Sequence, residues 1–204
     1  MVETSDTVSG AVLTGGRSRR LGRDKAGLDP YGLGSMLDVG LVALRASGCA
    51  DLAMIGGAAR PTAIDGVVHV ADMFPDEGPL GGIISALRWS PSDLVVVVAC
   101  DMPFLHSAVI DSLITTLRSA PACAVALASV GEREQPLTAV WRRSFALRTL
   151  EGAFTAGERA PRRVLPQLEH RLVPIVDPAV VVDIDSEADI DRYAHIARLR
   201  REEE

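Results

Sequence analysis

The sequence predicts a three-layer α/β sandwich in which helices cover both faces of a mainly parallel β-sheet. Apolar runs of strand length alternate along the chain with longer amphipathic segments, as in successive strand–helix units. Residues 94–99 are an uninterrupted apolar run, which is typical of a strand covered on both faces. The chain shows no internal repeat, low-complexity tract or linker, so we expect residues 1–204 to form a single domain.

The first half of the chain supplies the central elements. The expected strands cover residues 8–13, 52–55, 67–70 and 94–99. The expected helices cover residues 36–46, 81–89 and 107–118. Gly48 stops the first helix, a turn at Gly78-Pro79 leads into the second, and Ser107 is the expected N-cap of the third.

The second half continues the alternation less regularly. Further strands are expected at residues 122–128, 137–140 and 180–184, and helices at residues 144–150, 162–168 and 187–201. The stretch 129–140 contains Gly131, several charges and Pro136, and it predicts a mobile loop or a small flap. Ligands of parallel sheets bind outside the carboxyl ends of the strands, which points to the residues after Leu13, Val70 and Ala99.

Composition excludes several classes of function. The net charge is −6 and aromatic residues make up 4%, which disfavours a nucleic-acid partner because such proteins need a basic face or base-stacking rings. No apolar run reaches the roughly 18 residues that span a bilayer, so no membrane partner is expected. The N-terminus lacks a secretory pattern and the three cysteines are not spaced as a disulfide framework, so we expect a cytoplasmic protein.

One segment is locally basic in this acidic chain. Residues 17–25 contain four arginines and Lys25, which is the only lysine of the sequence, directly after the glycines at 15 and 16. Glycine lets backbone N–H groups approach an anion closely, arginine supplies paired donors, and lysine supplies a compact charge. We therefore expect this segment to receive the phosphates of a small polyanion.

The spacing of this segment excludes two common phosphate loops. A Walker A motif needs four residues between its glycines, whereas five separate Gly16 from Gly22. The dinucleotide-binding GxGxxG pattern fails as well, because Gly15 and Gly16 are adjacent. A third kind of nucleotide site is indicated.

The segment 13–25 resembles the N-terminal signature of nucleotidyltransferases with a Rossmann-like fold, and most of all that of the molybdenum cofactor guanylyltransferases. Further matches are Asp72, Gly78-Pro79-Leu80-Gly81-Gly82, Cys100-Asp101-Met102-Pro103-Phe104, Gln135-Pro136-Leu137, Ala156-Gly157-Glu158-Arg159 and Asp183-Ile184-Asp185-Ser186-Glu187. The run 78–82 favours the guanylyl branch over the cytidylyl branch.

The resemblance implies a Rossmann-like nucleotidyltransferase sheet and transfer of GMP from GTP to molybdopterin or molybdenum cofactor, with release of pyrophosphate. It implies catalytic roles for Arg19, Lys25 and Asp101. The implied nucleotide-binding residues are Leu13, Thr14, Gly15, Gly16, Lys25, Asp72, Gly78, Pro79, Leu80 and Asp101. Gln135, Pro136 and Arg159 are implied to contact the acceptor.

The resemblance also implies Mg²⁺, held by Asp101 and Asp185. The residues alone leave other roles open: Asp101 suits a turn-capping carboxylate equally well, and Asp185 suits the acidic start of a helix. The chain has no Asn, so Gly56-Gly57 and Asp183-Ile184-Asp185 stand where relatives often carry it. Two alternatives remain: a related nucleotidyltransferase that uses CTP or another phosphorylated acceptor, and a degenerate nucleotide-binding module without turnover.

Overall fold

A mixed, mostly parallel sheet of seven strands forms the centre of the molecule. The computed structural model describes residues 7–15 and 24–202. The strands are β1 (Val8–Leu13), β2 (Asp51–Ile55), β3 (Val67–Val70), β4 (Leu94–Ala99), β5 (Val125–Val130), β6 (Arg133–Arg142) and β7 (His170–Pro174). Their order is β3-β2-β1-β4-β6-β5-β7, and β6 runs antiparallel to both of its neighbours. The expected mainly parallel sheet is confirmed.

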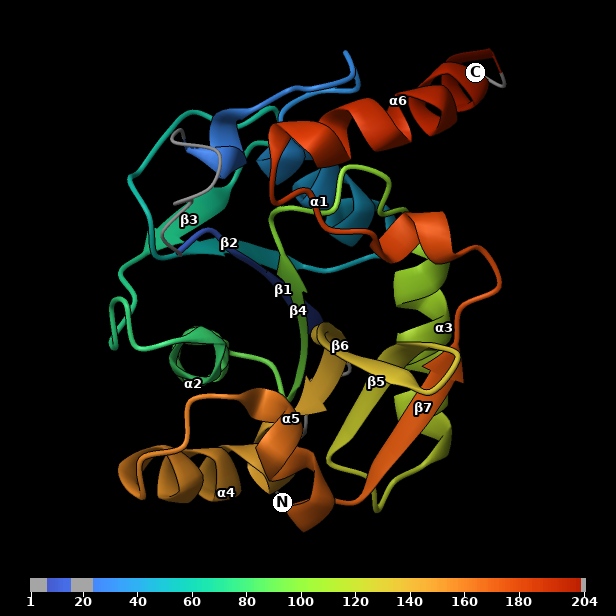
Figure 1. Ribbon diagram of the computed structural model, residues 1–204. Coiled ribbons are helices and arrows are strands. Elements are labelled where there is room, and N and C mark those ends of the chain that lie inside the picture. Colours follow the sequence, from blue (N-terminus) through green and yellow to red (C-terminus); the bar gives the residue numbers. More distant parts are fainter. Residues whose placement is uncertain (1–6, 16–23, 203–204) are drawn as a thin grey trace.

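Helices cover both faces of this sheet (Figure 1). On one face, α1 (Met36–Ala46) and α3 (Ser107–Ser119) bury Leu41, Leu44 and Ile110 against the strands. On the other face lie α2 (Pro79–Trp89), α4 (Arg143–Thr155) and α5 (Pro161–Val164), with Ile83 and Ile84 fully buried. Two apolar cores therefore sandwich the sheet, and the three-layer architecture predicted from sequence is confirmed.

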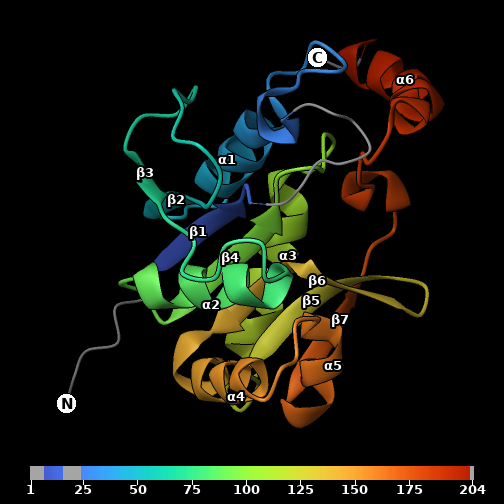
Figure 2. The same cartoon turned by 60° about the vertical axis from the view of Figure 1, so that its left-hand side comes forward.

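The last helix, α6 (Glu187–Glu202), lies beside the segment that leads into α1 (Figure 2). The ring of Tyr31 stacks on Phe104 at 5.2 Å between centroids, and its hydroxyl donates to the carbonyl of Ile190. Met36, Ile184 and Ala197 belong to the same buried cluster. The contacts hold the residues before α6 close to the carboxyl end of β4. Within the described residues, no helix is both long and apolar enough to cross a membrane.

The second half differs from the expectations at one predicted strand, at one strand that was not expected and at one stretch that is more regular than a loop. Residues 180–184 do not form a strand, because Pro178 and the side-chain cap from Asp177 to the Ala179 N–H favour the short 3-10 turn η3 (Pro178–Val181). The edge position is taken by β7, which pairs with β5. None of its residues is buried, so its sequence lacks the alternation of apolar and polar residues that would indicate a strand. The stretch 129–140 is part of a β-hairpin, in which Gly131 turns at φ 56°.

Smaller differences concern helix ends. Ser107 is the first residue of α3 rather than its N-cap, a position held by His106 without a side-chain hydrogen bond. Pro79 begins α2, with Gly78 as N-cap. Three cysteines, Cys49, Cys100 and Cys123, are buried free thiols.

Candidate active site

Strand register brings the predicted site residues to one edge of the sheet. Leu13 at the end of β1 pairs with Ile55 at the end of β2 and with Ala99 at the end of β4. Ile55 in turn pairs with Val70 of β3. Four parallel strands therefore end at one level, and the chain leaves the sheet at a topological switch point between β1 and β4.

The start of the glycine-rich turn is fixed to the end of β2. The N–H of Thr14 donates to the Ile55 carbonyl at 2.9 Å, and its hydroxyl lies 2.7 Å from the carbonyl oxygen of Gly56. Gly56 and Gly57 both have positive φ, and a Cβ on Gly57 would lie 3.0 Å from the Thr14 carbonyl oxygen. Glycines are needed here because the β1 and β2 turns approach each other closely. Thr14 thus positions Gly15 at the pocket through its backbone contacts.

Lys25 joins two carboxylates that are far apart in sequence. It opens the short turn η1 (Lys25–Gly27), which is capped by Asp24. Its Nζ donates to Oδ2 of Asp101 at 3.3 Å and to Oδ1 of Asp185. The Lys25 side chain is 13% exposed and that of Asp101 is 23% exposed. The two acidic residues proposed from sequence therefore converge on one cation.

Burial governs the electrostatics of this group. Burial acts to lower the pKa of Lys25, but the hydrogen bond to Asp185 and the charge of Asp101 outweigh it, so the pKa is raised above its ordinary value. The pKa of Asp101 is also raised, because burial disfavours its carboxylate more strongly than Lys25 favours it. Lys25 therefore carries its positive charge at neutral pH.

The same carboxylates fit a hard divalent cation. No cluster of three or more metal-ligating side chains occurs among the residues that the structure describes. Mg²⁺ seldom needs such a cluster, because it is commonly bound by one or two carboxylates and completes its coordination shell with water and substrate phosphates. Asp101 and Asp185 both contact the Lys25 ammonium, so one oxygen of each carboxylate faces the same position, which a positive charge occupies. The donor set is compatible with Mg²⁺ at this point.

A pocket of about 1050 Å³ opens at this edge of the sheet. Its walls include Gly15, Lys25, Asp72, Gly78, Pro79, Gly82, Asp101 and Leu137. The size lies at the upper end of the range for small-molecule sites, and the walls mix charged groups with backbone that carries no side chain. A ligand with both an anionic part and a polar planar part suits these walls.

Other predicted residues lie outside the pocket or outside the described chain. Gly16 and Arg19 belong to residues 16–23, which the structure does not describe. Leu80 is fully buried in the core, and its N–H donates to the carbonyl of Arg159 at 3.2 Å. Gln135 and Pro136 lie in β6 at a register irregularity, next to the pocket residue Leu137.

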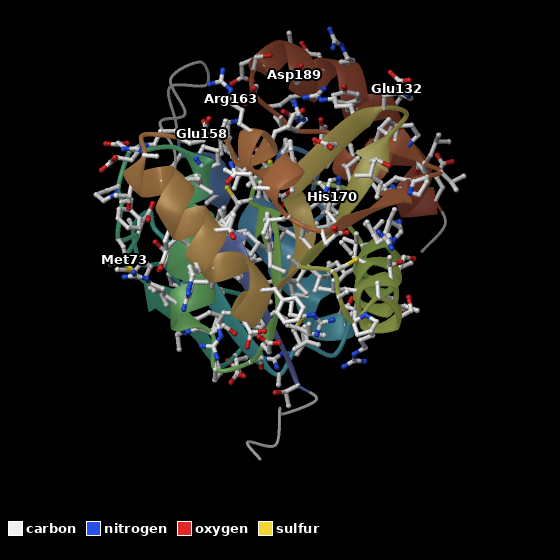
Figure 3. The ribbon with its side chains drawn as sticks, turned by 90° about the horizontal axis from the view of Figure 1, so that it is seen from below. Met73, Glu132, Glu158, Arg163, His170 and Asp189 are labelled. Atoms are coloured by element: carbon white, nitrogen blue, oxygen red, sulfur yellow. The ribbon has the colours of Figure 1, made fainter. Side chains whose placement is uncertain are left out.

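The side chain of Arg159 is held in place by contacts with Glu77 and Phe154. Its guanidinium donates to Oε2 of Glu77 at 2.6 Å and to the Phe154 carbonyl at 2.8 Å, and it lies 4.0 Å above the Phe154 ring. Nearby, Glu158 and Arg163 lie side by side with 3.7 Å between their charged atoms (Figure 3). Arg159 thereby fastens the turn before α2 to the end of α4.

Sequence reasoning missed two features of the site. Gly56 and Gly57 line the pocket, and their positive φ was signalled by the paired glycines after an apolar strand. Ser85 is 1% exposed and donates to Oδ1 of Asp72 at 2.8 Å. A serine inside the otherwise apolar run Ile83-Ile84-Ser85-Ala86-Leu87 was the available signal.

Comparison with known proteins agrees with this arrangement. Residues 10–172 match the family described as MobA-like NTP transferase domain. The chain is 36% identical over 157 residues to a probable molybdenum cofactor guanylyltransferase of Chloroflexus aggregans, covering 74% of this chain and 73% of that one. It is 32% identical over 171 residues to a protein of the same description from Opitutus terrae, covering 82% of both chains.

The fold has a close counterpart among solved structures. The molybdopterin-guanine dinucleotide biosynthesis protein A of Archaeoglobus fulgidus superposes with a TM-score of 0.74 at 22% identity, covering 94% of this chain and 99% of that one. Fold and sequence together define a nucleotidyltransferase. The chain belongs to the MobA-like NTP transferase family, and the resemblance seen in its motifs is confirmed.

Proposed function

We propose that this protein transfers GMP from GTP to the terminal phosphate of molybdopterin or molybdenum cofactor, forming the guanine dinucleotide cofactor and pyrophosphate. The observation that carries the proposal is the contact of Lys25 with Asp101 and Asp185 beside a pocket whose walls include Lys25, Asp101 and Asp72. Relatives named molybdenum cofactor guanylyltransferase support the choice of base and acceptor.

The base end of the nucleotide lies near Asp72 and the start of α2. Guanine offers an N1–H and an exocyclic amine, and a carboxylate accepts from such donors. A Cβ placed on Gly15 would lie 3.8 Å from Oδ2 of Asp72, so the glycine leaves this oxygen accessible beside the turn. Gly78 and Pro79 form the neighbouring wall and present backbone to the ligand.

The phosphate end lies near Lys25. Phosphoryl transfer asks little covalent work of the protein, so positioning and charge neutralisation supply most of the acceleration. Lys25 binds the phosphates of GTP, together with the glycine-rich turn and Arg19. Asp101 and Asp185 would hold Mg²⁺, which when bound supplies positive charge to the phosphate oxygens.

The acceptor approaches from the side of β6. Leu137 lines the pocket there, and Gln135 and Pro136 precede it in the strand. Arg159 is 40% exposed and already paired with Glu77, so its part in acceptor binding requires exchange of that partner for the acceptor phosphate. The charge of Arg159 is the attractive element on this side.

Calorimetry with GTP, CTP, ATP and UTP in the presence of Mg²⁺ tests the nucleotide choice, using wild-type protein and Lys25→Ala. GTP preference in the wild type, much weakened in the variant, supports the proposal and leads to a turnover assay with molybdopterin. CTP preference would replace it by cytidylyl transfer. GTP binding without any turnover on molybdopterin or molybdenum cofactor would leave a nucleotide-binding module and refute the proposed reaction.

A further inference from the structure

A buried hydroxyl on α2 contacts the Asp72 carboxylate. Ser85 lies in the second turn of α2, is 1% exposed, and donates to Oδ1 of Asp72 at 2.8 Å. The Gly81 carbonyl lies 3.0 Å from the same hydroxyl, but the hydroxyl has one proton, and the nearer, negatively charged acceptor is Asp72. The Ser85 oxygen also accepts the N–H of Met73 at 3.0 Å.

These contacts use one oxygen of Asp72 and leave the other. Oδ1 accepts from Ser85 and from the N–H of Phe74 at 3.0 Å, which occupies both of its lone-pair directions. Within the described residues, both hydrogen bonds that Asp72 accepts reach Oδ1. Oδ2 lies toward Gly15, on the pocket side. The donors of the protein thus bind Oδ1 of Asp72, and Oδ2 is the oxygen on the side of the ligand.

The position is also restricted sterically. A Cβ placed on Gly56 would lie 3.3 Å from the Cβ of Asp72, and one on Gly81 would lie 2.8 Å from the Cβ of Phe74. The backbone around Asp72 therefore packs tightly between the β2 turn and α2. With this backbone fixed, the Phe74 N–H and the Ser85 hydroxyl are the two donors that hold the carboxylate, and Ser85 is the one supplied by a side chain.

We propose that Ser85 is a positioning residue for base selection: it fixes Asp72 so that Oδ2 accepts an N–H from the base of the donor nucleotide. The proposal rests on the proposed function for the identity of that base, which is guanine. With Oδ1 already filled, Asp72 offers guanine a single oxygen rather than a bidentate carboxylate. Adenine has no N1–H to donate, and its only donor on that edge, the N6 amine, lies at a different position from the guanine N1–H, so adenine gains less from an Oδ2 that is fixed for guanine.

The test compares binding of GTP and ATP by calorimetry in wild type, Ser85→Ala and Ser85→Cys. Loss of a hydrogen bond to a charged group predicts GTP binding about tenfold weaker in Ser85→Ala, with ATP binding little changed, so the GTP:ATP preference falls. Ser85→Cys keeps the shape with a poorer donor and should be intermediate. It also provides the measurement if the Ser85→Ala protein does not fold.

The matched control is Ser90→Ala. Ser90 is a buried serine at the other end of α2; its hydroxyl donates to the carbonyl of Ser92 rather than to a carboxylate, and it accepts the N–H of Ser92. Ser90 lies outside the pocket walls, so its loss should lower stability while the GTP:ATP preference stays at the wild-type value.

A double-mutant cycle with Asp72→Ala shows whether Ser85 acts through Asp72. We expect Ser85→Ala to have little further effect on GTP binding once the carboxylate is absent. An equal loss in both backgrounds, or an unchanged GTP:ATP preference in Ser85→Ala and Ser85→Cys, overturns the inference while leaving the proposed function in place. If the wild type prefers CTP, guanylyl transfer fails and the same cycle run with CTP decides the role of Ser85; if it binds no nucleotide, both proposals fail.

Discussion

The Nζ atom of Lys25 lies 3.3 Å from Oδ2 of Asp101, across 76 positions of sequence. Lys25 opens η1, the next described element after β1, and Asp101 follows the end of β4. The pairing exists because β1 and β4 are neighbours in register, with Leu13 opposite Ala99. The residue that we propose for phosphate binding and one that we propose for metal binding thus form an ion pair with each other.

Removal of either partner should impair turnover severely. We expect Lys25→Ala and Asp101→Ala each to lower kcat/KM on the order of 10²–10³-fold, because preorganised charge is the main source of acceleration in this kind of transfer. Steady-state kinetics with GTP and the acceptor measure the effect. Arg88→Ala is the control, since Arg88 pairs with Glu151 outside the pocket walls. Near-normal turnover in either pocket variant would refute the assigned roles.

The same ion pair predicts a metal-dependent stability in one variant. Lys25→Ala removes the ammonium that both Asp101 and Asp185 contact, and with it a positive charge between the two carboxylates. We expect millimolar Mg²⁺ to raise the Tm of this variant by about 2–4 °C in the absence of nucleotide, and to change the wild type much less.

Thermal unfolding followed by circular dichroism, with Mg²⁺ or EDTA, measures that difference. Arg88→Ala again serves as control, because removing Arg88 from its surface ion pair with Glu151 does not create a site for a cation. Equal Mg²⁺ shifts in the wild type and Lys25→Ala would show that the ammonium and the metal ion do not share one position.

Gly78 is expected to tolerate no side chain. It has φ 90° and ψ 172°, a conformation essentially restricted to glycine, and a Cβ there would lie 3.3 Å from the carbonyl oxygen of Arg159. We expect Gly78→Ala to reduce the free energy of unfolding by about 1–3 kcal/mol and to weaken nucleotide binding, since α2 begins at the next residue.

Gly48→Ala is the control that introduces backbone strain without displacing any neighbouring atom. Gly48 also has positive φ, at 76°, but a Cβ there would meet nothing within 4 Å. This variant should lose about 1–2 kcal/mol of stability with unchanged nucleotide affinity. Chemical denaturation and calorimetry on both variants make the comparison, and equal affinities in the two would contradict the assignment of Gly78 to the pocket wall.

The buried thiols predict a pH dependence. Burial raises the pKa of Cys49 and of Cys100 to about 12. At pH 8 roughly one thiol in 10⁴ is then a thiolate, so both should resist alkylation in the folded protein. Because the unfolded chain releases these protons at lower pH, stability should fall as pH rises above about 9.

Mass spectrometry after iodoacetamide treatment at pH 8 measures this protection peptide by peptide. The denatured protein is the control and should be alkylated at both positions. Rapid modification of Cys100 in the native state would show that its environment is more open than the 8% exposure of its side chain indicates.

Much of the fold was predictable because local patterns and tertiary packing agree. The expected strands 8–13, 67–70 and 94–99 and the helix 36–46 have the observed boundaries. The clearest cases are strand 94–99, a buried strand that is a continuous apolar run, and the helix, which has an apolar stripe. Failures occurred where packing overrides pattern. Val180 and Val181 are residue types that favour strands, but they lie in a 3-10 turn that begins at Pro178, and from there their side chains pack into the core.

The candidate site divides in the same way. The sequence by itself determined the fold class, the family resemblance and part of the pocket wall, such as Gly15, Lys25, Asp72 and Asp101, because strand ends, glycine turns and a solitary lysine are local features. Only the tertiary structure decided that Lys25 bridges Asp101 and Asp185, that Leu80 is core, and that Ser85 holds Asp72. These relationships depend on strand order and helix placement, which join segments far apart in the chain and which local patterns do not encode.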